Sequence, residues 1–313
     1  MLSTLDLRLI AIGLAVLGAI GLALGAQFQN DAVGEREGAA TARPGALSLK
    51  QLFKLVRHPR WISGMGLIVL ALVLQLGALS LAPLIVVQPI GAIALVITSV
   101  LNARITKTKL NRGSIVALGL CILGIGLFVG QASTVAHEVE IGDSTLWQVL
   151  GLLMVILVIL GVLFFTVGKK MKALSFIIGA GVLYGFVATL TKVIIQRAYQ
   201  LQFEWLTVLC LVALLGAVSL GGWFVQNAYA SGPPDLVIAG LTVIDPLVAV
   251  FVGIFVLGEA QSASGWMVAV FGLSGLGAVT GVYMLSKVHP EIIAAEKRLA
   301  KLTKRPAERH QSN

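Results

Sequence analysis

The stretch Gln75-Leu76-Gly77-Ala78-Leu79-Ser80-Leu81-Ala82-Pro83-Leu84-Ile85-Val86-Val87-Gln88-Pro89 decides how this chain folds. Long apolar runs lie on both sides of Pro83, at residues 61–80 and 83–102. A run of about 20 apolar residues is long enough to cross a bilayer as a helix. Because proline lacks a backbone donor and clashes with the preceding turn, Pro83 separates two helices. The stretch therefore predicts two membrane helices joined by a tight turn.

Composition gives the rest of the chain the same character. The 313 residues are 58% hydrophobic and 12% charged, with a mean hydropathy of +0.96, whereas charged residues make up about 25% of soluble domains. Nine apolar runs cover residues 9–27, 61–80, 83–102, 113–130, 146–168, 174–197, 205–229, 236–257 and 263–286. We therefore predict an all-α polytopic membrane protein with about nine transmembrane helices. Such a chain has no room for a separate catalytic domain, so we expect no enzyme activity and no cofactor.

The positive charges predict the orientation of these helices. Of the 23 lysines and arginines, 20 fall on one side of the nine-helix arrangement, and the exceptions are Arg8, Lys192 and Arg197. Cytoplasmic loops are enriched in positive residues, so that side is expected to be cytoplasmic. We predict a multi-pass protein of the bacterial plasma (inner) membrane, with its N-terminus outside and its C-terminus in the cytoplasm. The net charge of +9 is then a record of topology and indicates no nucleic-acid partner.

Parts of the opening stretch recur in the second half of the chain. Three residues repeat at a separation of 151 positions: Gln75, Ser80 and Pro83 match Gln226, Ser231 and Pro234. A polar residue followed by proline also occurs twice within a run, as Gln88-Pro89 and Asp245-Pro246. The two units start on opposite sides of the membrane and are therefore inverted. Inverted repeats are typical of secondary transporters, whose substrate site lies near the midplane where the units meet.

This repeat divides the chain into predicted parts. The first unit covers 1–131 and includes an amphipathic cytoplasmic segment at 47–57. A connecting helix at 146–168 leads to the second, inverted unit at 174–286 and a basic cytoplasmic tail at 287–313. Four G-x-x-x-G pairs predict close packing between helices: Gly21 and Gly25, Gly126 and Gly130, Gly181 and Gly185, and Gly277 and Gly281.

Asp245 is the first candidate for a functional residue, because it is the only acidic residue within the nine runs. A carboxylate in the membrane interior must be protonated, paired or open to water. Its expected partner is Lys192 in the sixth run, although that ammonium could instead reach the outer surface by snorkelling. A buried carboxyl suits a proton carrier in a coupled transporter, and a structural ion pair is the alternative.

Other groups within the runs complete the predicted pathway. Pro89 and Pro246 each remove a backbone hydrogen bond, and the freed carbonyls are tolerated where they line a cavity. The amides and the hydroxyl that could contact a solute belong to Gln75, Gln88, Tyr184, Gln226 and Asn227. For each of these five, hydrogen bonding to a neighbouring helix is the competing role. The sequence has no metal-ligand spacing and no phosphate-binding loop, so neither a resident metal nor ATP-driven transport is predicted.

These residues resemble a known group of transporters. Residues 58–64, His-Pro-Arg-Trp-Ile-Ser-Gly, together with 75–89, look like bacterial, actinobacterial-type members of the drug/metabolite transporter superfamily. They also resemble its NIPA-like branch, which is linked to magnesium transport. The second half is similar to EamA-type repeats in Tyr184-Gly185, Lys192, Asp245-Pro246 and Leu257-Gly258-Glu259. The first unit departs from that pattern, because it lacks one helix and has Asn102 where the second has Glu259.

Four functions remain open from the sequence. The leading hypothesis is a secondary transporter that moves a small solute or metabolite by alternating access, coupled to protons or another gradient. The alternatives are a NIPA-like transporter of magnesium or another divalent cation, and a lipid-type flippase. A non-transporting membrane scaffold or accessory subunit represents a different class. The expected partners are the small-molecule or ion substrate and membrane lipids, with the protein acting as a monomer or homodimer.

Overall fold

The computed structural model describes residues 4–37, 57–105, 111–167, 173–202, 204–231 and 234–288, and most of these residues are helical. Ten helices occupy these ranges: α1 (Thr4–Glu37), α3 (Pro59–Leu81), α4 (Leu84–Gly91), α5 (Ile93–Ile105), α6 (Arg112–Val135), α7 (Asp143–Val167), α8 (Ala173–Tyr199), α9 (Trp205–Ser231), α10 (Pro234–Phe255) and α11 (Gly265–Val288). Eight segments are long and apolar enough to cross a membrane, and Gly240–Phe255 is a shorter apolar helix. The predicted fold class is confirmed. The predicted segment 47–57 and tail 287–313 lie almost entirely outside the described residues.

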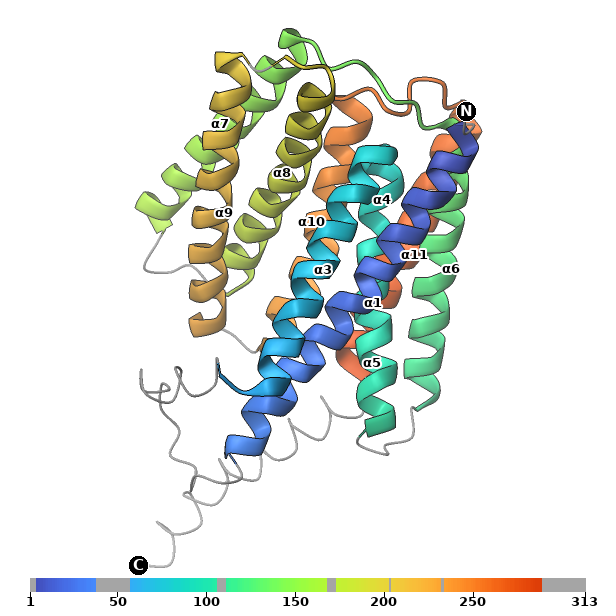
Figure 1. Ribbon diagram of the computed structural model, residues 1–313, viewed down its shortest axis with the longest axis vertical. Helices are drawn as coiled ribbons and strands as arrows, with labels where there is room; N and C mark the ends of the chain where they lie inside the picture. The colour runs from blue at the N-terminus through green and yellow to red at the C-terminus, as the bar shows by residue number, and fades with distance from the viewer. Residues whose placement is uncertain are drawn as a thin grey trace, which may run out of the picture.

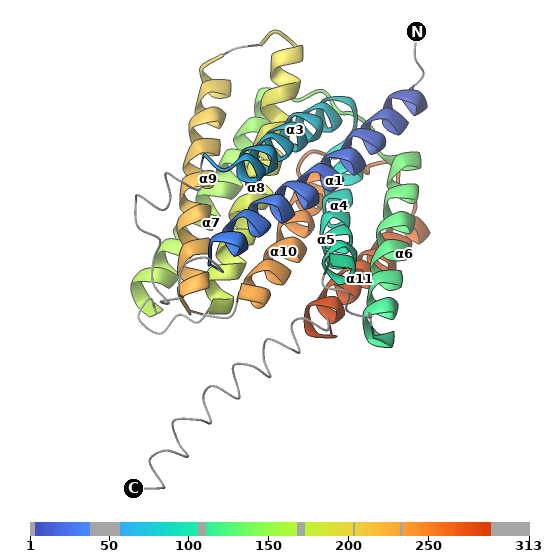
Figure 2. The same ribbon diagram turned by 60° about the horizontal axis from the view of Figure 1, so that its bottom comes forward.

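The helices form one bundle with two recognisable ends (Figure 1). Helices α7 and α9 lie along one side of the bundle, and α6 and α11 lie along the other, with α3, α4 and α10 between them (Figures 1 and 2). We call the end that carries the turn between α3 and α4 the upper end, as it is drawn in Figure 1. The charge pattern predicts that this end faces outward.

The third predicted span, residues 83–102, is broken into two helices, whereas the eighth, residues 236–257, forms one continuous helix over most of its length. The break separates α4 from α5 at Ala92, whose backbone nitrogen donates to the carbonyl of Pro89 at 3.2 Å. Proline at position 89 cannot donate a backbone hydrogen bond to the preceding turn, which weakens the helix there, and α4 ends two residues later at Gly91. Pro246 occupies the middle of α10 without ending that helix. The matched prolines of the two units therefore have different effects on the backbone.

Small residues bring the helices into close contact, as the glycine spacing predicts. A Cβ atom on Gly181 would lie 2.7 Å from Cβ of Ile244, and one on Gly185 would lie 2.6 Å from Cβ of Val248, so α8 and α10 pack directly against each other. A Cβ on Gly25 would meet the carbonyl oxygen of Gly64 at 2.8 Å, which joins α1 to α3. Gly126 and Gly130 do not pack in this way, because both face open space.

The pairing of helices follows the order in the sequence. Helix α1 packs along α3, and α8 packs along α9. The last helices of the two predicted units, α6 and α11, lie against each other, and α4 contacts α10. Two inverted units would produce this arrangement, although the boundaries of those units remain predictions. The contact between α4 and α10 places the two polar–proline pairs in neighbouring helices.

Candidate functional site

Asp245 lies in the middle of α10 with an unsatisfied carboxylate oxygen. Its Oδ1 atom is buried and has no hydrogen-bond partner among the residues that the structure describes. Tyr184 of α8 is close enough to interact with it electrostatically. Glycine permits this approach, because a Cβ on Gly181 would lie 3.5 Å from the backbone nitrogen of Asp245. A buried carboxylate without a partner costs several kcal/mol, so this position needs a proton, a cation or water.

The second notable feature is a small cavity between the two predicted units. It has a volume of about 60 Å³ and is lined by residues of α4, α6, α10 and α11, including both Pro89 and Pro246. Its walls are otherwise almost entirely apolar, and Thr242 directs its hydroxyl to the carbonyl oxygen of Ile238 at 2.8 Å. A water needs roughly 10–15 Å³ of such space. The cavity therefore has room for a few waters but offers them few partners.

Of the remaining predicted residues, the structure brings some near this region and leaves others apart. Gln88 is buried on α4, directly before Pro89. Gln75 is only partly buried on α3, and Gln226 is exposed on α9. The amide of Asn227 donates to the carbonyl oxygen of Trp223 within its own helix at 2.8 Å. The repeated glutamines Gln75 and Gln226 thus lie on different helices, α3 and α9.

The expected pairing of Asp245 with Lys192 is wrong. Lys192 is 1% exposed and donates three hydrogen bonds from Nζ: to the carbonyl oxygens of Leu79 and Ala82, at 2.8 and 2.9 Å, and to Oε1 of Glu138 at 2.7 Å. Carbonyls at the end of a helix have no partner within it and carry the negative end of its dipole. Lys192 therefore satisfies the last turn of α3 at the upper end, and its charge is fully used there.

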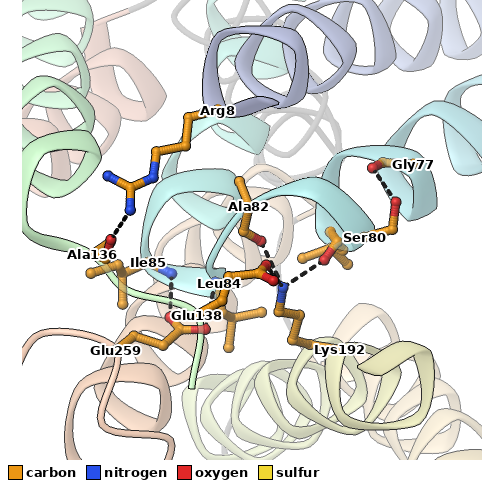
Figure 3. A network of polar contacts seen from close by, with 11 residues as sticks. Arg8, Gly77, Ser80, Ala82, Leu84, Ile85, Ala136, Glu138, Lys192 and Glu259 are labelled. Carbon is orange, nitrogen blue, oxygen red and sulfur yellow. Dashed lines mark hydrogen bonds and ion pairs between the residues drawn. The ribbon is translucent and has the colours of Figure 1, made fainter. Parts of the chain in front are cut away.

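Glu259 binds backbone N–H groups on the other side of the same turn, whereas Lys192 binds carbonyl groups (Figure 3). Its Oε1 accepts from the backbone nitrogen of Leu84 at 2.8 Å, and its Oε2 accepts from that of Ile85 at 2.9 Å. These are free donors of the first turn of α4, where the helix dipole favours an anion. Burial raises the pKa of Glu259, whereas the two amides and Lys192 act to lower it. The net result is a buried acid whose charge depends on these partners.

Two glycines allow Glu259 to take this position. Gly258 has a φ of +70°, a left-handed conformation that favours glycine. A Cβ on Gly253 would lie 2.8 Å from Oε2 of Glu259 and 2.9 Å from Cγ2 of Ile85. In the sequence, Glu259 stands out only as part of a family resemblance and has no predicted role. Two sequence features could have identified it. One is an acidic residue that follows a glycine at the end of α10, and the other is that α4 begins directly after a proline and has free backbone donors there.

The segment 136–142, between α6 and α7, ties this region together. The backbone nitrogen of His137 donates to the carbonyl oxygen of Glu259 at 2.9 Å, and Glu138 forms the ion pair with Lys192. At one end of the segment, Arg8 donates to the carbonyl oxygen of Ala136, as Figure 3 shows. It also donates to that of Ser133 in α6. At the other end, the guanidinium of the buried Arg197 forms an ion pair with Asp143.

These contacts explain the three exceptions in the charge count. Arg8, Lys192 and Arg197 are the cations that the sequence placed away from the basic side. Each of them binds the segment 136–142 or a residue next to it. Paired cations of this kind serve local structure, so they do not conflict with the orientation that the other 20 predict.

Comparison with known proteins identifies the family of this chain. The family model described as "Magnesium transporter NIPA" matches residues 7–201, which is more than half of the chain. The chain belongs to this family. Its membership agrees with the resemblance to the NIPA-like branch and makes the protein a member of a family of membrane transporters.

Relatives of this NIPA-family protein occur in bacteria, fungi and plants. An uncharacterized protein of Corynebacterium glutamicum is 28% identical over 88% of this chain and 95% of its own length. A probable magnesium transporter of Candida albicans is 30% identical over 43% of this chain and 36% of its own length. The probable magnesium transporter NIPA9 of Arabidopsis thaliana is 24% identical over 76% of this chain and 75% of its own length. No solved structure matches.

The arrangement limits the chemistry that this NIPA-family protein can perform on a metal ion. Among the described residues, no group of three or more histidine, cysteine, aspartate or glutamate side chains is placed to hold a metal. Mg²⁺ gives up water reluctantly and is commonly bound through one or two carboxylates while it keeps several waters. A single buried carboxylate such as that of Asp245 can therefore contact a hydrated ion, but it cannot replace the ion's water shell.

Proposed function

We propose that this NIPA-family protein transports Mg²⁺ or a similar divalent cation by alternating access, and that Asp245 is the residue that contacts the ion. The observation that carries the proposal is the buried Oδ1 of Asp245, which has no hydrogen-bond partner among the described residues. Such an oxygen is costly in a membrane unless a cation or a proton accompanies it. The family, and the relatives that are described as probable magnesium transporters, support a divalent cation as the substrate.

The surroundings of Asp245 support a site of passage. Tyr184 of α8 is close enough to interact electrostatically with the carboxylate, and Gln88 is buried on α4, the helix of the first predicted unit that contacts α10. The break after α4 lies beside the cavity shared by Pro89 and Pro246. A site formed by both units near the middle of the membrane is the arrangement expected for inverted-repeat transporters.

Proton-coupled movement of a small solute is the second candidate, and the same carboxylate favours it. No described residue donates a hydrogen bond to Oδ1 of Asp245, and a single proton suffices to neutralise this carboxylate. A flippase is less well supported. The cavity of about 580 Å³ between α7 and α9 is lined almost entirely by apolar side chains and has no charged residue to recognise a headgroup.

Growth on limiting magnesium tests the proposal in cells. We expect the protein to restore growth and magnesium content to bacteria that lack their own magnesium transporters, and we expect Asp245→Asn to abolish the rescue. The matched control is Glu204→Gln, which removes an exposed carboxylate before α9 and should leave rescue intact. If both variants rescue equally at equal membrane abundance, Asp245 does not contact the ion. If even the unchanged protein fails to raise magnesium content, the substrate is a different solute.

A further inference from the structure

The turn between α3 and α4 is held by two buried side chains of opposite charge that come from the other half of the chain. Lys192, from α8, binds the carbonyl oxygens of Leu79 and Ala82 before the turn. Glu259, from the connection between α10 and α11, binds the backbone nitrogens after it. Each charge is matched to the helix end that it contacts, because a cation suits the C-terminus of α3 and an anion suits the N-terminus of α4.

The same two residues close the upper end of the bundle. Figure 3 shows that Lys192 and Glu259 approach the turn from below in that view, with Glu138 beside them. Glu138 connects Lys192 to the segment 136–142, and the carbonyl oxygen of Glu259 holds His137 of that segment. Four separate parts of the chain therefore meet at one cluster of three charged side chains.

The cluster lies between the upper surface and Asp245. Lys192 is eight residues beyond Tyr184 on α8, which corresponds to about 12 Å along a helix. A hollow of about 320 Å³ lies on the upper side of the cluster and is lined by Ser80, Glu138 and Glu140 among others. Glu138 is 46% exposed, whereas Lys192 is 1% exposed. Solvent at the upper end thus reaches Glu138 and stops at Lys192.

We propose that Lys192 and Glu259 form a latch that closes the upper entrance to the Asp245 site, and that both must leave the α3–α4 turn when this entrance opens. This inference rests on the proposed alternating-access function. Its contacts suit a reversible closure, because they are hydrogen bonds from two charges to backbone groups, which water can replace when the turn moves away. The residue that matches Glu259 in the first unit is the uncharged Asn102, so the charged latch belongs to one end of the protein.

Accessibility of a buried reporter tests the latch without relying on transport. Gln88→Cys places a thiol on α4 one turn below the amides that Glu259 holds, at a position that is 9% exposed. The measurement is its labelling rate by a membrane-impermeant maleimide applied to each face of sealed vesicles in turn. Labelling of the buried Cys121 and Cys210 is subtracted by using the parent without the reporter.

We expect Lys192→Met to raise the labelling rate from the upper face by about tenfold or more, since each hydrogen bond to a charged group contributes at least that factor. Glu259→Gln should raise it as well, because a side-chain amide has only one oxygen acceptor for the two backbone donors. Glu138→Gln should have a smaller effect, because Lys192 keeps its two bonds to the α3 carbonyls. The matched control is Arg197→Met, which removes another buried cation of α8 that does not touch the turn.

The outcomes separate the latch from a general loss of structure and from the proposed substrate. Unchanged labelling in folded, monodisperse Lys192→Met and Glu259→Gln variants would overturn the latch. An equal increase in Arg197→Met would also overturn it, because it would indicate loosening without specific opening. Magnesium flux is measured on matched vesicles whose protein keeps Gln88, because this residue belongs to the proposed site. Faster labelling in a protein that moves no magnesium would support the latch and contradict the proposed substrate.

Discussion

Replacing Gly185 by alanine tests the helix contact that holds Asp245 against α8. The new Cβ would lie 2.6 Å from Cβ of Val248, 2.7 Å from its Cγ1 and 3.1 Å from the backbone nitrogen of Ala249. Carbon atoms in contact normally lie about 3.5–4.0 Å apart. Cβ of Val248 cannot rotate away, so α8 and α10 must separate by roughly 1 Å at this point. Overpacking of this kind costs about 1–3 kcal/mol.

The same displacement reaches the candidate site. Gly181 lies one turn away on α8 and packs against the backbone of Asp245. We therefore expect Gly185→Ala to lower both the apparent Tm of the purified protein and its rate of magnesium transport. The control is Gly126→Ala, since Gly126 has no atom within 4 Å of the new Cβ. There alanine should be neutral or stabilising, because it favours helix over glycine by about 1 kcal/mol.

Comparison of these two alanine variants tests whether α8 and α10 are in contact at Gly185. Thermal unfolding in detergent, followed at several protein concentrations, gives the apparent Tm for each variant. A Tm of Gly185→Ala equal to that of Gly126→Ala would show that α8 and α10 do not touch as described. A lower Tm with an unchanged transport rate would retain the contact but separate it from the function of Asp245.

Three further predictions concern the topology and the upper end. Reporter fusions after Gln131 and after Lys172 should report outside and inside respectively, and the reverse result would contradict the charge-based orientation. Because burial raises the pKa of Glu259 above its ordinary value of 4.5, the folded protein takes up this proton more readily than the unfolded chain. The contribution of Glu259 to stability is therefore present in full below pH 4.5 and declines as the pH rises through the raised pKa. The apparent Tm of the wild type, relative to that of Glu259→Gln, should fall between pH 4.5 and the raised pKa. Arg197→Met should lower the apparent Tm, and prior replacement of its partner by Asp143→Asn should reduce that loss, because one charge of the pair is then already absent.

Much of the fold could be predicted because a bilayer imposes simple rules on a sequence. The apolar runs identified the membrane helices, and Pro83 identified the turn between two of them. The ends of helices were less well predicted: α1 extends over Thr4–Glu37, beyond the run at 9–27, because a helix can continue into polar residues outside the lipid. The different effects of Pro89 and Pro246 were also not predictable, since each depends on neighbouring helices that the local sequence does not reveal.

The candidate site was predicted only in part, because charge partners are set by three-dimensional distance. Asp245 was identified by its isolation in apolar sequence, and the structure places it with a buried, unpartnered oxygen. Lys192 was assigned to it because both charges lie within membrane runs, yet the carbonyls of α3 and Glu138 take all three donors of the ammonium. The partners of Glu259 are backbone groups more than 170 positions away. Side-chain chemistry alone does not point to partners of that kind.

The most direct test of the proposed function is the initial rate of Mg²⁺ entry into sealed proteoliposomes, read by a fluorescent indicator inside. We predict a protein-dependent flux that saturates with external Mg²⁺, persists when the pH gradient is abolished, and disappears in Asp245→Asn but not in Glu204→Gln. A wild-type flux no faster than that of protein-free vesicles would show that the protein does not transport Mg²⁺. An Asp245→Asn variant that carries Mg²⁺ at the wild-type rate would show that Asp245 does not contact the ion.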